Sequence, residues 1–549
     1  MTMFPQPIGP IPEETRRIAR AANPKGTLAI WLRDELGTIY TDEDFSDLYP
    51  ERGQPALAPW RLALVTLVQY VEDLTDRQAA EAVRSRLDWK YLLGLELTDP
   101  GFDFSVLSEF RQRLLEQGAE SRLLDKLLVV CRERGWLKAG GKMRTDATHV
   151  LAAVRSLHYL ETVGETVRAV LEDLAQVASD WLVSWMPQEW FKRYEGRMDS
   201  RRLPKREAER QQLAEQIGRD GARLLGALAQ ADTPASAQEL ASVQVLRQVW
   251  PQYYEEREGQ VSWRDGPAQG AQETIVSPYD TDARLAQKRD TAWCGYKVHL
   301  TETCEPDLPE VIVQVKTTLA PRPDVKETLE LERELAQRHL LPEEHLLDGG
   351  YLESEVLVKH PPGLRIIGPV PPDTSWQAHE GKGYDVAHFQ VDWANRTATC
   401  PQGHESHAWR QRPDREGQII VTFAARVCQG CPVRTDCTKG RQREVQLQPQ
   451  AQTEALQRQR AEQQTRAFRQ RYALRSGVEA TISQAVRCLP LRQSRYRGMA
   501  KVHLQQVVTA TALNCLRLHA YVEGVPRGIT WVSHLARLKR HREQEQPAA

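Results

Sequence analysis

A single carboxylate in a strongly basic stretch is the residue of this chain best suited to chemistry. Glu479 lies in RYALRSGVEATISQAVRCLPLRQSRYRGMAK (471–501). If this stretch is helical, Tyr472, Arg475 and Glu479 share one face. Between Thr438 and His503 there are fourteen Lys or Arg against four Glu and no Asp, although the formal net charge of the whole chain is -1. This asymmetry predicts a surface for a polyanion, and the alternative is an amphipathic core helix with a solvated Arg-rich face.

Two aspartates elsewhere in the chain are the strongest candidates to act with Glu479. Metal-dependent phosphoryl transfer needs carboxylates from distant segments, because two divalent cations about 4 Å apart require several hard oxygen ligands. Asp146 lies in KMRTDATHVLAAV (142–154), which reads as a strand, and Asp348 follows the short apolar strand of EEHLLDGGYLESEVL (343–357), before a new helix. We expect both aspartates at the ends of neighbouring strands, with the helix of Glu479 laid across them.

These three acids would hold a pair of Mg²⁺ or Mn²⁺ ions that activate a water or a DNA 3′-hydroxyl for displacement at phosphorus. The other interpretation makes each aspartate an ordinary turn or cap residue. Asp280, Asp282 and Glu302 are the carboxylates that would serve if one of the three does not. His149 and His299 are expected to be packed or hydrogen-bonded in the core rather than to bind metal.

Four of the nine cysteines form a cluster with zinc-ligand spacing. Cys400 precedes His404 in CPQGH, and Cys428, Cys431 and Cys437 follow in C-x2-C-P-x4-C. Four thiolates suit tetrahedral zinc, and His404 could replace one of them because Cys400 has no C-x2-C partner. We expect a structural Zn²⁺ that holds a small polar insertion together, and the alternative is a set of free, buried cysteines. The odd cysteine count argues against a disulfide framework.

The composition is that of an ordinary soluble protein. The 549 residues are 41% hydrophobic and 27% charged, and they suffice for three or four domains. The longest apolar run, Leu62 to Val68, is far too short to cross a bilayer. We therefore expect a cytoplasmic protein without membrane contact.

The order of the predicted elements indicates a mixed α/β core. From Pro55 to Gly118 the pattern is helical, and basic side chains on these helices suggest a helix-turn-helix-like DNA-binding module: Arg77, Arg84, Arg86, Lys90, Arg111 and Arg113. After the strand of Asp146 come a strand hairpin (CGYKVHLTET and EVIVQVKTTLA), a helix at 324–338, the strand before Asp348, RIIGPV and the helix of Glu479. This is the element order of an RNase H-like α/β core.

The same patterns divide the chain into segments. We expect a helical N-terminal DNA-binding domain (1–135), the first part of the core (140–156), a helical insertion (157–276) and the second part of the core (277–370). A zinc-ribbon-like insertion (371–450), in which IIVTFAARV reads as a strand, precedes the closing helix with a basic C-terminal helical part (451–520) and a tail (521–549).

Several stretches resemble the DDE transposases of bacterial insertion sequences. They are TDATHV around Asp146, SPYDTDARLAQKRDTAWCGYKVHLTETC from Ser277, LLDGGY around Asp348, and Tyr472-x2-Arg475-x3-Glu479 followed by SRYRGMAKVHLQQVVTATALNCLRL. The chain is similar in particular to the subgroup with a Tyr-x2-Arg-x3-Glu signature and a cysteine-bearing insert. LDWKYLLGL and FDFSVLSEFRQRL also resemble the N-terminal domain of that family, so the resemblance spans most of residues 55–520.

The resemblance implies roles for five residues. Asp146, Asp348 and Glu479 would bind the catalytic divalent metals, and Tyr472 and Arg475 would hold terminal DNA phosphates next to Glu479. A planar guanidinium one turn from a carboxylate is suited to binding a phosphate.

The basic residues after Glu479 depart from the family pattern at one position. The family usually has a Lys seven residues after this Glu, where the chain has Val486, and Arg487 beside it would take over the DNA contact. No neighbouring acid neutralises the next four cations, so we expect them to follow a DNA backbone: Arg492, Arg495, Arg497 and Lys501.

We therefore expect a DNA transposase that cuts the terminal inverted repeats of its own element and joins the freed 3′-hydroxyls to target DNA. Because both ends must be handled together, a homodimer or larger assembly on DNA is expected. Two alternatives stay open. A metal-dependent nuclease or resolvase on the same core would cleave without joining, and a catalytically silent, zinc-containing DNA-binding protein would do neither.

Overall fold

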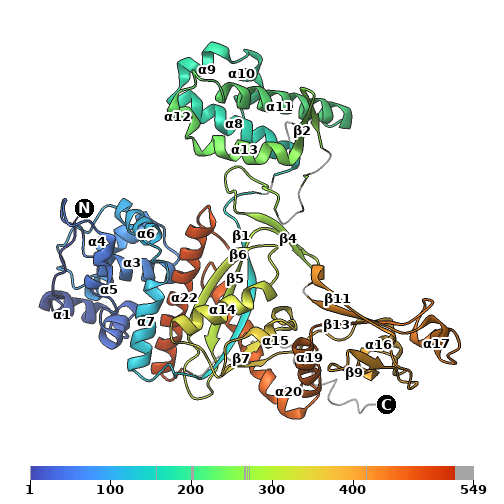
Figure 1. Cartoon of the computed structure of the whole chain (residues 1–549). Helices are drawn as coiled ribbons and strands as arrows, with labels where there is room; N and C mark the ends of the chain where they lie inside the picture. Colours follow the sequence, from blue (N-terminus) through green and yellow to red (C-terminus); the bar gives the residue numbers. More distant parts are fainter. Residues whose placement is uncertain are drawn as a thin grey trace, which may run out of the picture. The chain divides into compact units, whose positions relative to one another are not determined.

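The computed structural model of the chain describes residues 2–155, 157–198, 203–264, 267–268, 270, 273–415 and 417–525 (Figure 1). The predicted tail therefore lies, from residue 526 on, outside the described residues. The chain forms two compact units. The first contains Met1–Val106, Pro309–Val311 and Thr511–Ala549, and the second contains Leu107–Leu308 and Ile312–Ala510.

The first unit is helical, as predicted for this region. Its helices are α1 (Glu13–Ala22), α2 (Leu28–Trp31), α3 (Pro59–Val71), α4 (Asp76–Ser85) and α5 (Leu87–Leu93). α3 is apolar around most of its circumference and is buried along nearly its whole length, which is typical of a central helix. α4 begins with the capping box of Thr75 and Gln78.

Two of the cations predicted to lie on the helix surface are buried instead. The ammonium of Lys90 donates to the carbonyls of Glu96 and Asp99, and the side chain is only 2% exposed. Arg111, on α6 (Ser105–Glu116), is also buried, and its guanidinium lies 5.6 Å from the ring centre of Tyr496. The surface prediction was wrong for these two because the period of a helix does not show whether a long basic side chain folds back to cap carbonyls or to stack on a ring.

The second unit contains a mixed six-stranded sheet. Its strands are β1 (Lys142–Leu151), β4 (Arg284–Lys288), β5 (Thr291–Thr303), β6 (Ile312–Leu319), β7 (Glu344–Leu347) and β8 (Arg365–Ile367). β6, β5, β1, β7 and β8 lie side by side in that order, and β4 pairs with the first residues of β5. β1, β7 and β8 are parallel, whereas β5 is antiparallel to β1, β4 and β6. The predicted mixed α/β core is confirmed at this level.

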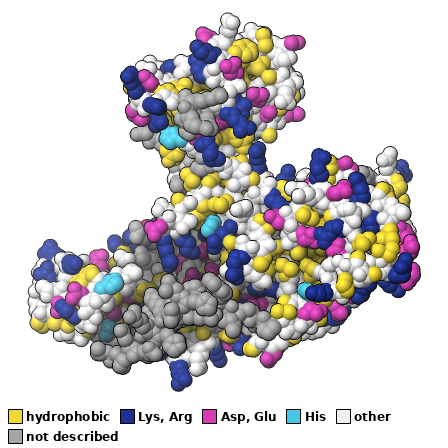
Figure 2. Space-filling view, turned by 180° about the vertical axis from the view of Figure 1, so that it is seen from behind, with side chains coloured by type: hydrophobic (Ala, Val, Ile, Leu, Met, Phe, Trp, Pro, Cys, Tyr) yellow, Lys and Arg dark blue, Asp and Glu magenta, His cyan; other side chains and the backbone are white. Residues whose placement is uncertain are grey.

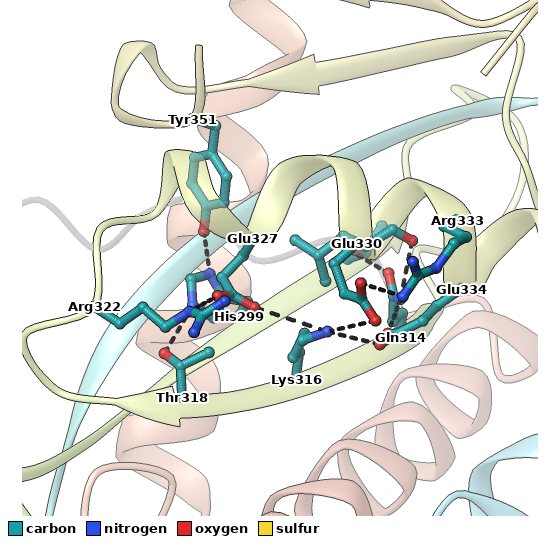
Figure 3. A network of polar contacts seen from close by, with 12 residues as sticks. His299, Gln314, Lys316, Thr318, Arg322, Glu327, Glu330, Arg333, Glu334 and Tyr351 are labelled. Atoms are coloured by element: carbon teal, nitrogen blue, oxygen red, sulfur yellow. Dashed lines mark hydrogen bonds and ion pairs between the residues drawn. The ribbon is translucent and has the colours of Figure 1, made fainter. Parts of the chain in front are cut away.

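α14 (Val325–Gln337) packs on this sheet and is tied to it by charges as well as by apolar contacts (Figure 3). Leu331 and Leu335 on the helix are fully buried. The ammonium of Lys316, on β6, lies 2.7 Å from Glu334 and within 4 Å of Glu327 and Glu330 on the helix. These ion pairs fix the position of α14 along β6.

Residues 159–263 form a helical bundle with its own core (Figure 1). The helices are α8 (Tyr159–Val177), α9 (Ser179–Trp185), α10 (Glu189–Tyr194), α11 (Glu207–Leu228), α12 (Ala235–Gln238) and α13 (Ala241–Tyr253), followed by the hairpin of β2 (Tyr254–Arg257) and β3 (Gln260–Trp263). Val170, Trp190, Ile217 and Tyr253 are among its buried side chains.

The cysteine-bearing segment contains two small sheets. β9 (Gln390–Asp392) pairs with β10 (Thr397–Thr399), and β11 (Ala408–Arg412), β12 (Gln418–Thr422) and β13 (Glu444–Leu447) form the other. Short helices complete it: α16 (Trp376–Glu380), α17 (Ala425–Gln429) and α18 (Arg434–Cys437). The predicted strand IIVTFAARV ends at Thr422, and its second half is α17, because Phe423 turns into the core of the segment.

The C-terminal region is helical but interrupted. α19 (Gln450–Glu462) and α20 (Arg466–Tyr472) are followed by a 3₁₀ turn (Ala473–Ser476), α21 (Gly477–Cys488) and α22 (Met499–Val522). The single helix predicted for Tyr472, Arg475 and Glu479 is therefore three elements. α7 (Arg122–Glu133) and α15 (Val356–Lys359) are the remaining α-helices of the described chain.

Charges of both signs are mixed on the face of the protein drawn in Figure 2. Figure 2 shows Lys and Arg side chains interspersed with Asp and Glu over the visible face, in line with the net charge of -1. A surface that binds a polyanion must therefore be a local group of basic residues. No helix of the described residues is both long and apolar enough to span a membrane.

Candidate active site

Asp146 lies inside a strand and not at its end. β1 continues to Leu151 because its antiparallel partner β5 follows it that far, pairing Asp146 with Leu300. The parallel partner β7 stops earlier, and the last rung on that side joins Thr145 to Leu347. Asp146 and Asp348 are thus each the first residue beyond this last rung, which brings them side by side as predicted, although only Asp348 follows a strand end.

Asp348 is held in place by the buried side chain of Tyr351, three residues later in the chain. Its carboxylate accepts from the N–H of Gly349 at 2.7 Å and begins a 3₁₀ turn, where a helix was predicted. The hydroxyl of Tyr351 in this turn lies 2.7 Å from the ring of His299, which also contacts Thr318 (Figure 3). Burial lowers the pKa of His299 to about 3, so the ring stays neutral. His299 is a core residue, as expected.

Glu479 is positioned by a buried ion pair that links β1, β5 and α21. Arg144, two residues before Asp146, donates through Nε to Glu302 at 2.7 Å and through Nη1 to the carbonyl of Leu474 at 2.7 Å. Glu302 also accepts from the hydroxyl of Thr481 on α21 at 2.6 Å. Arg144 and Glu302 are 4% and 0% exposed. Glu302 was expected as a spare carboxylate, and the structure gives it this structural role instead.

Arg475 lies at the centre of the three predicted acids. Its Nη2 is 2.7 Å from Oδ2 of Asp146 and 3.9 Å from Oδ2 of Asp348, and its Nη1 is 2.6 Å from Oε1 of Glu479. We refer to Asp146, Asp348 and Glu479 as the acid cluster. The structure brings together all three members and the arginine of the predicted signature.

The charges of this cluster depend on one another. Burial raises the pKa of Asp146, the charge of Arg475 opposes that rise, and the nearby Asp348 adds to it. Burial lowers the pKa of Arg475, but the surrounding carboxylates outweigh it, and the net shift is upward. The guanidinium therefore stays charged and offsets the repulsion between the acids.

Tyr472 is half-buried beside this cluster. Its ring stacks on Phe468 at 5.7 Å between centres. Burial raises the pKa of its phenol, so the hydroxyl keeps its proton at neutral pH. The residue thus combines a packed aromatic ring with a hydroxyl near the acids.

Two adjoining pockets, which we together call the groove, lie over the acid cluster and share Asp146 and Glu479 among their lining residues. One stretch runs along α21, and the other runs along the β4–β5 hairpin and past Asp348. Besides Arg475, five cations line it: Lys288, Arg289, Lys297, Arg487 and Arg492. Arg492 also donates to the hydroxyl of Thr148 at 2.9 Å.

The other predicted DNA-binding cations are not in the lining of this groove. The guanidinium of Arg497 lies 5.6 Å from the ring centre of Tyr279, and Lys501 lines a separate pocket with α6. Arg495 donates its backbone N–H to Gln505 at 2.8 Å. The structure thus brings Arg487 and Arg492, but not these three, to the acids.

Lys288 and Arg289 are groove residues that the sequence analysis missed. They form the end of the tight hairpin between β4 and β5, and the signal available in the sequence was the basic QKRD. The remaining spare carboxylates have structural partners. Asp280 accepts from the hydroxyl of Tyr296 at 2.6 Å, and Asp282 accepts from the N–H of Met499 at 2.8 Å.

The predicted zinc ligands lie around one pocket. Cys400, His404, Cys428, Cys431 and Cys437 all line it. Burial raises the pKa of Cys437, and the three other cysteines raise it further. Such a donor set suits zinc. Within the described part of the chain, however, no group of three or more His, Cys, Asp or Glu residues has its donor atoms arranged to hold a metal ion.

Comparison with known protein families agrees with this picture. Residues 399–519 match a family described as transposase DDE domain, and residues 22–113 match a family described as transposase domain (DUF772). No curated protein matches the chain. The first match includes the four clustered cysteines, Arg475 and Glu479, and Asp146 and Asp348 lie outside it. The two matches indicate a transposase that acts on DNA, and the DDE domain implies an enzyme that cleaves DNA and transfers DNA strands.

Proposed function

We propose that this transposase cuts the ends of its own insertion element and joins them to target DNA by phosphoryl transfer at the acid cluster. One observation supports this most strongly. Three acids from β1, from the turn after β7 and from α21 converge on the single guanidinium of Arg475. The strand order β6-β5-β1-β7-β8, with α21 closing over β1, agrees with the RNase H-like core expected from the sequence.

The donor chemistry of the cluster fits hard divalent cations. Asp146, Asp348 and Glu479 would hold Mg²⁺ or Mn²⁺, which supplies an activated hydroxyl nucleophile and charge neutralisation at the leaving oxygen. Glu479 is well exposed and Asp348 is half-exposed, so both have room to turn toward a ligand. Arg475, whose charge balances the acids in this structure, would then be released to bind a DNA phosphate beside Glu479.

The other basic and polar groups would position the DNA strand. Tyr472 keeps its phenolic proton and can donate it to a phosphate oxygen next to Arg475. Arg487 and Arg492 line the groove and would hold backbone phosphates on the α21 side. Since both ends of an element must be handled together, we expect the active form to be a dimer or larger assembly on DNA.

The cysteine pocket would hold a structural Zn²⁺. The convergence of the four predicted cysteine ligands and of His404, the possible substitute, on one pocket supports this. We expect about one zinc per chain in purified protein, and Cys428→Ser should lower both the zinc content and the melting temperature. Cys488→Ser, at an exposed isolated cysteine, is the matched control and should change neither. Zinc-free protein with full stability would contradict the proposal.

The function is tested with DNA that carries the inverted repeats flanking the gene. We expect cleavage and joining that require Mg²⁺ or Mn²⁺, and joined products that contain two ends. Cleavage without joining would instead indicate a nuclease or resolvase. DNA binding without cleavage under any divalent metal would indicate a catalytically silent protein.

A further inference from the structure

The groove over the acid cluster has basic residues on both sides of the acids. Arg487 lines only the stretch along α21, whereas Lys288 and Arg289 line only the stretch along the β4–β5 hairpin. Asp146 and Glu479 line both stretches. Arg492 also lines both stretches, so a strand that follows the whole groove past the acids would meet Arg487 only on one side of them and Lys288 and Arg289 only on the other.

The two hairpin cations are available for a ligand. Both are exposed, and in the described part of the chain neither has an ion-pair partner. Lys297, by contrast, lines the same stretch but is held by Asp324 and by the carbonyl of Arg322, each at 2.6 Å.

The hairpin holds these two side chains in a fixed place. Lys288 pairs with Thr291, so the turn has only two residues, and β5 continues from it without a break to the strand beside β1. Arg289 has a φ of 55°, a conformation in which Gly or Asn is preferred at such a turn. A bulky side chain at this position conflicts with the local preference of the backbone, a mismatch that is found more often at functional sites.

We propose that Lys288 and Arg289 bind backbone phosphates of the DNA strand that is cut, on the side of the scissile phosphate opposite to the phosphates held by Arg487. The contacts are to phosphate, so they position the strand and carry no sequence preference. This inference rests on the proposed function, because it takes the acid cluster as the place where DNA is cut.

The first test measures binding of inverted-repeat DNA as a function of salt for Lys288→Gln and Arg289→Gln. Each lost phosphate contact should weaken binding and make the slope of log K against log salt less negative by about 0.9. The matched controls are Lys138→Gln and Arg396→Gln, which change exposed cations outside the groove. Arg396 also has a φ of 55°. Slopes in the hairpin variants that equal those of the controls would overturn the inference.

A second test assigns the side of the scissile phosphate. Neutral methylphosphonate linkages, placed one at a time, should weaken binding by the wild type on both sides of the cut. In the Lys288→Gln/Arg289→Gln double variant, the linkages on one side should lose their effect while those on the other side keep it. An unchanged pattern of interference would overturn the inference. If the wild type binds but never cuts, the proposed function fails while these binding results still test the hairpin.

A third variant separates a binding role from a structural one. Arg289→Gly relieves the unfavourable φ and removes the charge, so it should raise the melting temperature while it weakens DNA binding. A lower melting temperature with unchanged DNA binding would show that Arg289 serves only the fold of the hairpin.

Discussion

Glu479→Gln should reduce metal-dependent cleavage and joining by more than about 10³-fold, which is the scale of losing one essential group from a catalytic set. The amide has nearly the same shape and can still accept the hydrogen bond that Arg475 now donates to Oε1 at 2.6 Å. It carries no negative charge, however, and is a weak ligand for Mg²⁺. The Glu479 side chain is 62% exposed, so the substitution should hardly change the free energy of unfolding.

The measurement compares joined products, DNA affinity and melting temperature in the wild type and the variant. Affinity and melting temperature should be retained while products disappear. Glu454→Gln is the matched control, because Glu454 is an exposed acid in the same basic region and does not line the groove, and it should behave as the wild type. Normal joining by Glu479→Gln would remove this residue from the acid cluster's chemistry.

Gly477→Ala should reduce joining by about 10²-fold, because misplacing a reacting group by 1 Å has an effect of this size. A Cβ atom at Gly477 would overlap the guanidinium of Arg144. That guanidinium cannot turn aside freely, since it is held by Glu302 and by the carbonyl of Leu474 in a nearly solvent-free space. The first turn of α21 must therefore move away from β1 and carry Glu479 with it.

The test of Gly477→Ala measures the rate of joining and the affinity for Mn²⁺. We expect both to fall, and a lower melting temperature, since the buried ion pair is disturbed. Gly226→Ala is the matched control, because Gly226 is also helical and a Cβ there meets nothing within 4 Å. That control should be neutral or slightly stabilising. Unimpaired joining by Gly477→Ala would show that Arg144 does not fix the position of α21.

The residue types and their chain order allowed the acid cluster to be predicted from the sequence. The strands around Asp146 and before Asp348 have short apolar patterns, and adjacency in a parallel pair follows from the element order. The placement of Asp146 inside β1 could not be predicted in this way. Strand length is decided by the partner, and here β5 extends the pairing well beyond the point where β7 stops.

The break between α20 and α21 shows a similar limit. The period of the apolar residues fits one continuous helix, but the carbonyl of Leu474 accepts from both the N–H of Gly477 and the side chain of Arg144. Arg144 is far away in the chain and reads locally as an ordinary basic strand residue. Its buried pairing with Glu302 becomes visible only when β1 and β5 are side by side. Lys288 and Arg289 could not be predicted as groove residues either. A two-residue turn with Arg at a positive φ contradicts the local preference of the backbone.

In the chain, the helical bundle separates β1 from the other strands of the sheet. This order determines when the enzyme becomes complete during synthesis. β1 leaves the ribosome long before either neighbouring strand, and it must wait while residues 159–263 fold by themselves. Such distant pairing is slow to form and leaves strand edges open for longer. Arg475 and Glu479 are the last residues of the site to leave the ribosome. A truncated or unfinished chain would therefore lack a complete acid cluster, and the capacity to break DNA arises only once almost the whole protein has been made.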